Sequence, residues 1–442
     1  MMRSAWKVAV ITAFLVFGSA ISFALQAVIA RQFGAGAAVD AYLYAMSLPL
    51  FVYGLVSAAM SYALTPIFVG LSGGKGPPGH DVGVLRQIAM LALLTLPLSL
   101  ALGWFMAILG PHLPGARSDL VRRPEFASLV QLCWAFAGLQ IATSVITIYL
   151  NSVHRPVIAA WFGTLNGTGA VVAAIFGSAF GLGAVVWGYI AGASLTLIIG
   201  LIVGRRHLLP PARPDFRAPV WRSMWRSTAS ALISTTSYTL WPVIDSFWAP
   251  LLGPGALAHL GFSQRVMIGI GSFFLTGPSM VLVPRLAAQI AAGEVQAFRR
   301  RAVLTVLAVS LAAAGASVGL YVLAPWLVRL AFQHGRFTVS DASVVVLYMR
   351  WMTPGFGMML VNVIVTRILF CIEAGNTWLS GIGLLWCGLY FGLSGILIRY
   401  TSAGIPIAYS ISWCVTGGLS ALLFAWMLSR PLPAAAGARA AA

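Results

Sequence analysis

The sequence has very little charge for its length, and acidic residues are the scarcest charged type. Only 8% of its 442 residues are charged, and nine Asp and Glu stand against 27 Lys and Arg. Hydrophobic residues make up 60% of the chain, and the mean hydropathy is +0.92. A water-soluble domain needs more polar surface than this composition supplies, so we expect a polytopic membrane protein.

The strict alternation of apolar and polar residues that marks membrane barrels is also missing. The first apolar run, 8–30, is longer than the roughly 20 residues that span a bilayer as a helix. It follows Arg3 and Lys7 but is too long for a signal peptide, so we expect it to be retained. The chain is therefore predicted to be all-α. The twelve predicted spans are 8–30, 38–70, 86–111, 127–152, 156–179, 181–204, 224–250, 256–288, 302–332, 342–371, 375–398 and 403–429.

Motifs of enzyme and metal chemistry are likewise lacking. The sequence contains no nucleophile paired with a base, no paired carboxylates and no phosphate-binding loop, and its longest outer loop, 112–126, is short. The cysteines lie inside apolar runs without metal-ligand spacing. We therefore expect no enzymatic activity, cofactor, metal site or disulfide. The four cysteines are Cys133, Cys371, Cys387 and Cys414.

Arginine and lysine residues are concentrated in alternate loops between the predicted spans. If the N-terminus is cytoplasmic, the largest groups, in 205–226 and 299–301, fall on the inner side of the membrane. The positive-inside rule then places both termini in the cytoplasm. Topology and contact with anionic lipids account for the net charge of +18, so a nucleic-acid partner is not expected.

The longest break between spans predicts a division of the chain into two halves. Residues 205–223 are rich in Arg and Pro and lack an apolar face, which is typical of a cytoplasmic linker. We expect six-helix bundles at 1–204 and 224–430, followed by a flexible cytoplasmic tail at 431–442.

Short motifs recur between the two halves at a nearly constant offset. FGAGA at 33–37 resembles LGPGA at 252–256, and LTPIF at 64–68 resembles LVPRL at 282–286, with offsets of 219 and 218. Six spans in each half bring both halves into the membrane from the same side. A parallel repeat follows, and two such bundles favour transport by alternating access.

Two charged residues flank the first predicted outer turn. Asp40 begins the second span, and Arg31 ends the first. Both positions suit the helix dipoles, and Asp40 can also cap its own helix, so a purely structural role explains them. The alternative is that Asp40 and Arg31 gate the outer mouth of a transport pathway.

Two further charges lie deeper in predicted spans. Asp245 is roughly 9 Å below the outer end of the seventh span, close to Pro242, which can kink the helix. Arg265 is roughly 15 Å into the eighth span, too deep for easy snorkelling. The two either form a structural ion pair, or Arg265 faces a cavity and meets an anionic substrate that Asp245 positions.

Several motifs together resemble a known family. They are ARQFGAGAAVDAYLYAMSLP at 30–49, LLGPGALAHLGFSQRV at 251–266, LVPRLA at 282–287 and FQHGRFTVSDA at 332–342. The chain thus resembles the MurJ/MviN family of lipid II flippases, in the MOP superfamily with the MATE drug exporters and Wzx-type flippases. The resemblance implies two bundles around a central cavity and translocation of an undecaprenyl-pyrophosphate-linked sugar to the periplasmic leaflet.

Individual residues agree with the family in part. Asp40 matches the family's helix-2 aspartate and Arg265 its cavity arginine of helix 8. Where the family has three further arginines, this chain has Ser19, Leu25 and Tyr53. Fewer cations weaken the capture of a pyrophosphate. We therefore expect a lipid-linked sugar that is either like lipid II or a repeat unit of an exopolysaccharide or surface glycan.

Two other functions fit the same sequence. A MATE-like exporter would couple cation export to proton or sodium binding at Asp40 or Asp245, and a non-transporting scaffold would organise glycan assembly. For the flippase, the expected partners are a lipid-linked glycan, membrane lipids and glycan-assembly enzymes. The expected location is the bacterial inner membrane.

Overall fold

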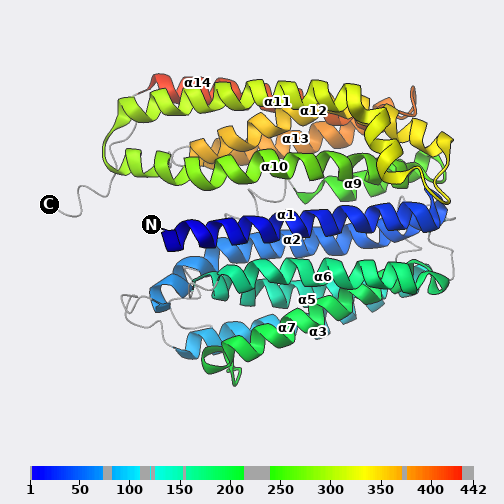
Figure 1. Cartoon of the computed structure of the whole chain (residues 1–442), viewed down its shortest axis with the longest axis horizontal. Helices are drawn as coiled ribbons and strands as arrows, with labels where there is room; N and C mark the ends of the chain where they lie inside the picture. Colours follow the sequence, from blue (N-terminus) through cyan, green and yellow to red (C-terminus); the bar gives the residue numbers. More distant parts are fainter. Residues whose placement is uncertain are drawn as a thin grey trace. The chain divides into compact units, whose positions relative to one another are not determined.

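The structure is a computed structural model that describes residues 2–72, 82–109, 120, 125–152, 156–213, 239–370 and 376–430. These residues form twelve α-helices and two short 3₁₀ helices, with no strand among them (Figure 1). The helices of the first half are α1 (Met2–Phe33), α2 (Ala37–Ser72), α3 (Val82–Leu109), α5 (Phe126–Ser152), α6 (Pro156–Phe176), η2 (Ser178–Phe180) and α7 (Leu182–Leu208). They are followed by α9 (Trp241–Trp248), η3 (Ala249–Leu252), α10 (Ala256–Ala291), α11 (Val295–Phe332), α12 (Val339–Phe370), α13 (Asn376–Leu397) and α14 (Gly404–Ser429).

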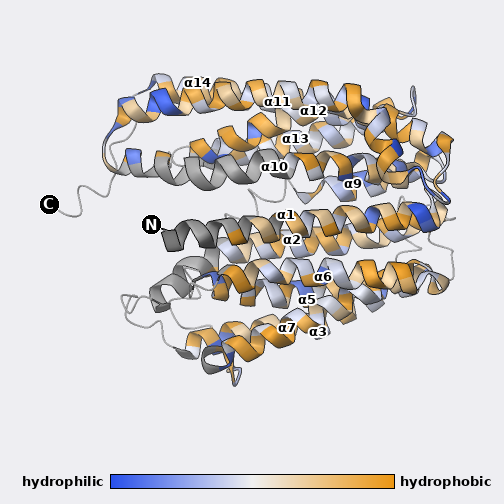
Figure 2. Cartoon of the chain, in the orientation of Figure 1, coloured by the Kyte–Doolittle hydropathy of each residue, from blue (hydrophilic) through white to orange (hydrophobic). Residues whose placement is uncertain are grey.

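Ten of these helices are long and apolar enough to cross a membrane, and Figure 2 shows hydrophobic residues along their lengths. Large apolar side chains such as Trp104, Phe176 and Leu311 are exposed on them. Exposed apolar side chains on long helices are the surface that a bilayer requires. The predicted all-α polytopic fold is confirmed.

The helix ends differ from the prediction where charged residues continue a helix beyond the apolar run. The ninth span was expected to begin at residue 302, but α11 begins at Val295 and includes Arg299 and Arg301. Hydropathy marks the part of a helix that lies in hydrocarbon, whereas helical hydrogen bonding continues into the headgroup region. Most of the seventh predicted span, 224–250, lies outside the described residues, which resume shortly before α9.

The chain folds into two compact units. The first contains Met1–Ala258 and His334–Phe337, and the second contains His259–Gln333 and Thr338–Ala442. Much of the predicted linker 205–223 lies outside the described residues, so the predicted domain boundaries stay a prediction.

The same pattern of helix pairing occurs in both units. In the first unit α3 packs on α5, α6 on α7, and α5 on α7. In the second unit α11 packs on α12, α13 on α14, and α12 on α14. These are corresponding helices if α9 and α10 repeat α1 and α2. The pairing supports the internal repeat that the motif offsets predict.

Glycines bring α6 and α7 of the first unit into close backbone contact. A Cβ on Gly188 would lie 2.4 Å from the carbonyl oxygen of Gly169, and one on Gly192 would lie 2.7 Å from Asn166 Cα. Small residues at such crossings are a common way of packing helices in membranes. This close approach lets polar side chains of α6 and α7 reach one another.

Candidate functional site

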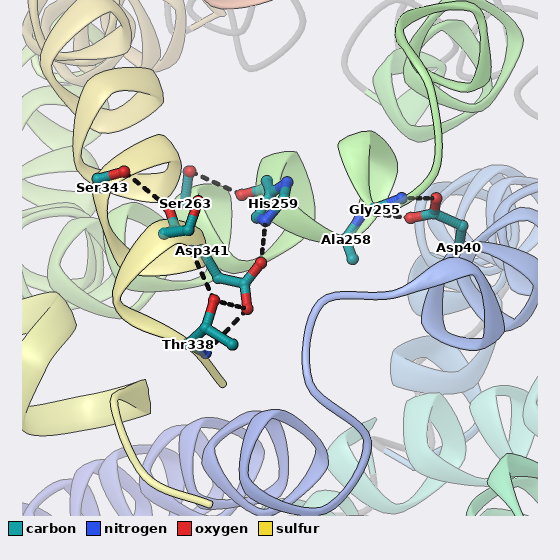
Figure 3. A network of polar contacts seen from close by, with 9 residues as sticks. Asp40, Gly255, Ala258, His259, Ser263, Thr338, Asp341 and Ser343 are labelled. Atoms are coloured by element: carbon teal, nitrogen blue, oxygen red, sulfur yellow. Dashed lines mark hydrogen bonds and ion pairs between the residues drawn. The ribbon is translucent and has the colours of Figure 1, made fainter. Parts of the chain in front are cut away.

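Asp40 binds the beginning of a helix far away in the sequence. It lies in the first turn of α2 and is 1% exposed. The backbone N–H of Gly255 donates to its Oδ2 over 2.5 Å, and that of Ala258 donates to its Oδ1 over 2.7 Å (Figure 3). These groups are among the first N–H groups of α10, which have no partner within that helix. The carboxylate therefore caps α10, although the sequence suggested a cap on its own helix.

Arg31 contributes its backbone to a second contact in the same unit. Its carbonyl oxygen, at the C-terminal end of α1, accepts a hydrogen bond from the N–H of Arg336 over 2.9 Å. Gly34 and Gly335 both have positive φ, and a Cβ on Gly335 would lie 2.2 Å from the Arg31 oxygen. The motifs FGAG and HGRF thus require glycine because their backbones touch. The Arg31 side chain is exposed.

A histidine and an aspartate form a matching pair in the second unit. His259, in the first turn of α10, lies 219 residues after Asp40, and its Nε2 is 2.9 Å from Asp341 Oδ1 at the start of α12 (Figure 3). The N–H and hydroxyl of Thr338 donate to Asp341 Oδ2, and the Asp341 N–H donates to Thr338 Oγ1. This reciprocal pattern is a capping box.

Sequence reasoning missed the pairing of His259 with Asp341. The signals that could have found it are the threonine and aspartate three residues apart in FTVSDA and the 219-residue offset from Asp40. Both units therefore place an ionisable side chain from the start of one helix at the start of a later helix.

The two deeper charges lie in different units. Asp245, in α9 of the first unit, is 2% exposed, and Ile244 and Ser246 beside it are also buried. Arg265 is the tenth residue of α10, in the second unit, and is half-buried. The predicted partnership of these two residues stays a prediction. Pro242 lies in the first turn of α9, where a missing N–H costs no hydrogen bond within that helix. The predicted kink of the seventh span stays a prediction, because residues 214–238 lie outside the described residues.

Sequence reasoning also missed a polar cavity inside the first unit. It has a volume of about 440 Å³ and is lined by residues of α1, α2, α5, α6 and α7. None of the described residues that line it is charged, whereas hydroxyl and amide groups are frequent among them. Its polar residues are scattered over five apolar spans, so no short motif could reveal them. They are Ser22, Tyr53, Ser57, Ser61, Gln140, Thr143, Ser144, Thr147, Asn151, Asn166, Tyr189 and Thr196.

The described residues contain no group of three His, Cys, Asp or Glu side chains that could hold a metal ion. Cys133, Cys387 and Cys414 are free thiols, and Cys371 lies outside the described residues.

Comparison with solved structures identifies the fold. A lipid II flippase MurJ in an inward closed conformation superposes with a TM-score of 0.78 at 16% identity, over 94% of this chain and 87% of that chain. An inward-facing multidrug resistance MATE family transporter of the MOP superfamily superposes with a TM-score of 0.76 at 14% identity, over 94% of each chain. The chain is thus a multi-pass helical membrane protein with the fold of the MOP superfamily.

Sequence comparison identifies the family within this class. A probable lipid II flippase MurJ from Thermotoga maritima is 23% identical over 72% of this chain and 63% of its own length. One from Bdellovibrio bacteriovorus is 23% identical over 37% of this chain and 32% of its own length. The sequence model described as lipid II flippase MurJ matches residues 29–438. The chain belongs to the lipid II flippase MurJ family.

Proposed function

We propose that the chain is a flippase that moves an undecaprenyl-pyrophosphate-linked sugar across the bacterial inner membrane by alternating access. Family membership supports this class of function, and the likeness to both MurJ and MATE structures supports a transporter fold. Transport of an intact lipid requires no bond to be made or broken, so no catalytic residue is assigned. The arginine distribution supports a cytoplasmic position for both termini.

The observation that carries the proposal is the position of Arg265. It is a half-buried cation ten residues into a helix of the second unit. In the described part of that unit, the one ion pair joins His259 and Asp341, so no carboxylate there neutralises Arg265. A cation at membrane depth is costly without a counter-ion. Arginine binds phosphate oxygens through two parallel hydrogen bonds, so a substrate pyrophosphate is a suitable counter-ion.

The other charged residues of the candidate site are assigned to substrate positioning and to gating. Asp245, buried in α9, is proposed to position the pyrophosphate. Asp40 and Arg31 act at the periplasmic gate, because their contacts hold the start of α10 and the 334–337 loop at the ends of α2 and α1. Enzymes that assemble and polymerise glycans are the expected neighbours in the membrane.

Complementation of a flippase-depleted strain tests the proposal. Wild type should restore translocation of its own lipid-linked glycan, and Arg265→Ala should reduce it about 10- to 100-fold, as expected for loss of a charged hydrogen-bonded contact. Arg350→Ala is the matched control, because Arg350 also lies on a spanning helix but stacks on Tyr321, 5.2 Å from its ring centroid. Equal transport by all three proteins, at equal membrane levels, would refute the role of Arg265.

The MATE-like alternative rests on the fold likeness and on the buried carboxylate of Asp245. A cation exporter predicts that deletion of the gene sensitises cells to cationic drugs and that Asp245→Asn fails to restore resistance. The flippase proposal predicts unchanged drug susceptibility and a change in glycan composition instead.

A further inference from the structure

The polar cavity of the first unit has the properties of a binding site for a neutral ligand. We propose that it receives an uncharged sugar of the lipid-linked substrate through the hydroxyl and amide groups of that sugar. This inference rests on the proposed function and adds the chemical class of the headgroup to it.

The size of the cavity fits such a ligand. Its volume of about 440 Å³ lies in the range of roughly 300–1,000 Å³ that is usual for small-molecule sites. Five spanning helices contribute to its lining, so it is built from the packed bundle and not from a loop.

A network of side chains fixes the geometry of the amide groups at the cavity. Asn166 Nδ2 donates to Gln140 Oε1 over 3.1 Å, and Thr143 Oγ1 lies 3.2 Å from the same oxygen. Thr196 Oγ1 lies 3.2 Å from Asn166 Oδ1. The hydroxyl hydrogens of Thr143 and Thr196 also reach backbone carbonyls of their own helices, at 3.0 and 2.8 Å. The orientation of the Gln140 amide therefore follows from the Asn166 donor, which joins α6 to α5.

The same network leaves one strong donor available. Gln140 Oε1 accepts from Asn166 Nδ2, whereas no described residue accepts a hydrogen bond from Gln140 Nε2. The side chain lines the cavity, and its nitrogen is not among the buried polar atoms without a partner. A ligand oxygen in the cavity can therefore accept from Gln140 Nε2.

The hydroxyl groups of the lining offer mainly acceptors. Ser144 donates to the Ile141 carbonyl over 2.7 Å, and Thr147 donates to the Thr143 carbonyl over 2.9 Å. Each hydroxyl hydrogen is thereby used within its own helix, while the oxygen lone pairs remain available. The cavity thus combines several acceptors with an amide donor. Sugar hydroxyls, which donate and accept, satisfy both kinds of group.

The described residues of the lining carry no charge, which selects against an ionised headgroup. A uronic acid carboxylate placed there would lose hydration and find no cation among the lining residues. The proposed function assigns the pyrophosphate to Arg265, so the part of the substrate left for this cavity is the sugar. Its selectivity is therefore for uncharged sugars.

Binding measurements on the full chain in lipid nanodiscs test the inference. The probes are undecaprenyl pyrophosphate alone, the same lipid carrying N-acetylglucosamine, and the same lipid carrying glucuronic acid. Wild type should bind the N-acetylglucosamine lipid about tenfold more tightly than the bare lipid, as one or two additional hydrogen bonds allow. The glucuronic acid lipid should gain nothing over the bare lipid.

Substitutions of cavity-lining residues test whether the preference for the N-acetylglucosamine lipid arises in the cavity. Gln140→Leu and the nearly isosteric Thr147→Val should each lower the preference for the N-acetylglucosamine lipid by at least threefold while leaving affinity for the bare lipid unchanged. Thr168→Val is the matched control, because Thr168 also donates to its own helix, to Thr164 over 2.8 Å, but is exposed and does not line the cavity. This control should keep the wild-type preference.

The possible failures are distinguishable. Equal wild-type affinity for the bare and N-acetylglucosamine lipids overturns this inference and leaves the proposed function intact. A sugar preference that survives in both cavity variants, or a sodium-dependent signal in place of a sugar preference, also overturns it. Failure of the wild type to bind even the bare pyrophosphate lipid would overturn the proposed function itself.

Discussion

Removal of the Asp40 carboxylate should destabilise the protein far more than removal of a typical helix-terminal acid. In Asp40→Ala the N–H groups of Gly255 and Ala258 lose their acceptor in a place where Asp40 is only 1% exposed. Water therefore cannot easily replace the lost oxygens. Each hydrogen bond to a charged group contributes about 1.5–3 kcal/mol, so the expected loss of two is about 3–6 kcal/mol. Asp40→Asn keeps one acceptor oxygen and should cost about half as much.

The free energy of unfolding in mixed detergent micelles, followed by tryptophan fluorescence during titration with SDS, measures this effect. Glu294→Ala is the matched control, because Glu294 is the N-terminal cap residue of α11 and its side chain makes no capping hydrogen bond. It should change stability by less than about 0.5 kcal/mol. Equal losses for Asp40→Ala and Glu294→Ala would show that the carboxylate does not hold α10 as described.

Three further predictions follow from contacts within single units. A double-mutant cycle on His259→Leu and Asp341→Asn should give a coupling energy of about 1 kcal/mol in the same unfolding assay, whereas additive effects would contradict their pairing. Gly335→Ala should destabilise by about 1–3 kcal/mol, because the residue has φ +67° and its new Cβ would meet the Arg31 carbonyl; unchanged stability would refute this docking. Gly188→Ala should cost about 1–3 kcal/mol by forcing α6 from α7, while Gly183→Ala, which meets nothing within 4 Å, should be neutral or stabilising.

The fold could be predicted from the sequence because a bilayer allows only a few kinds of spanning structure. Apolar runs longer than the hydrocarbon thickness must be helices, and ten of the twelve predicted spans correspond to helices able to cross a membrane. The predicted ends of the helices were less accurate than their number. In α11 the helix includes Arg299 to Arg301, where the hydropathy of the sequence has already fallen. The repeat was visible because its glycine turns are short, local motifs.

The contacts of the candidate site could be predicted only in part. Asp40 stood out as a rare acid at a helix start, but its partners lie 215 and 218 residues away, a distance that no local rule covers. Gln140, Asn166 and Thr196 come from three helices and meet only after packing at Gly188 and Gly192. Uncharged polar residues are common in spanning helices, so nothing in the sequence set these three apart.

Translocation in sealed proteoliposomes tests the central claim most directly. A fluorescent undecaprenyl-pyrophosphate-linked sugar is placed in both leaflets, and a membrane-impermeant quencher reports how fast the inner pool reaches the outer leaflet. The translocation rate with the wild type should clearly exceed that of protein-free liposomes, and Arg350→Ala should match the wild-type rate. The rate with Arg265→Ala should be about 10- to 100-fold lower. Rates for wild type no higher than for protein-free liposomes would contradict flippase activity, and full activity of Arg265→Ala would contradict the role given to the arginine.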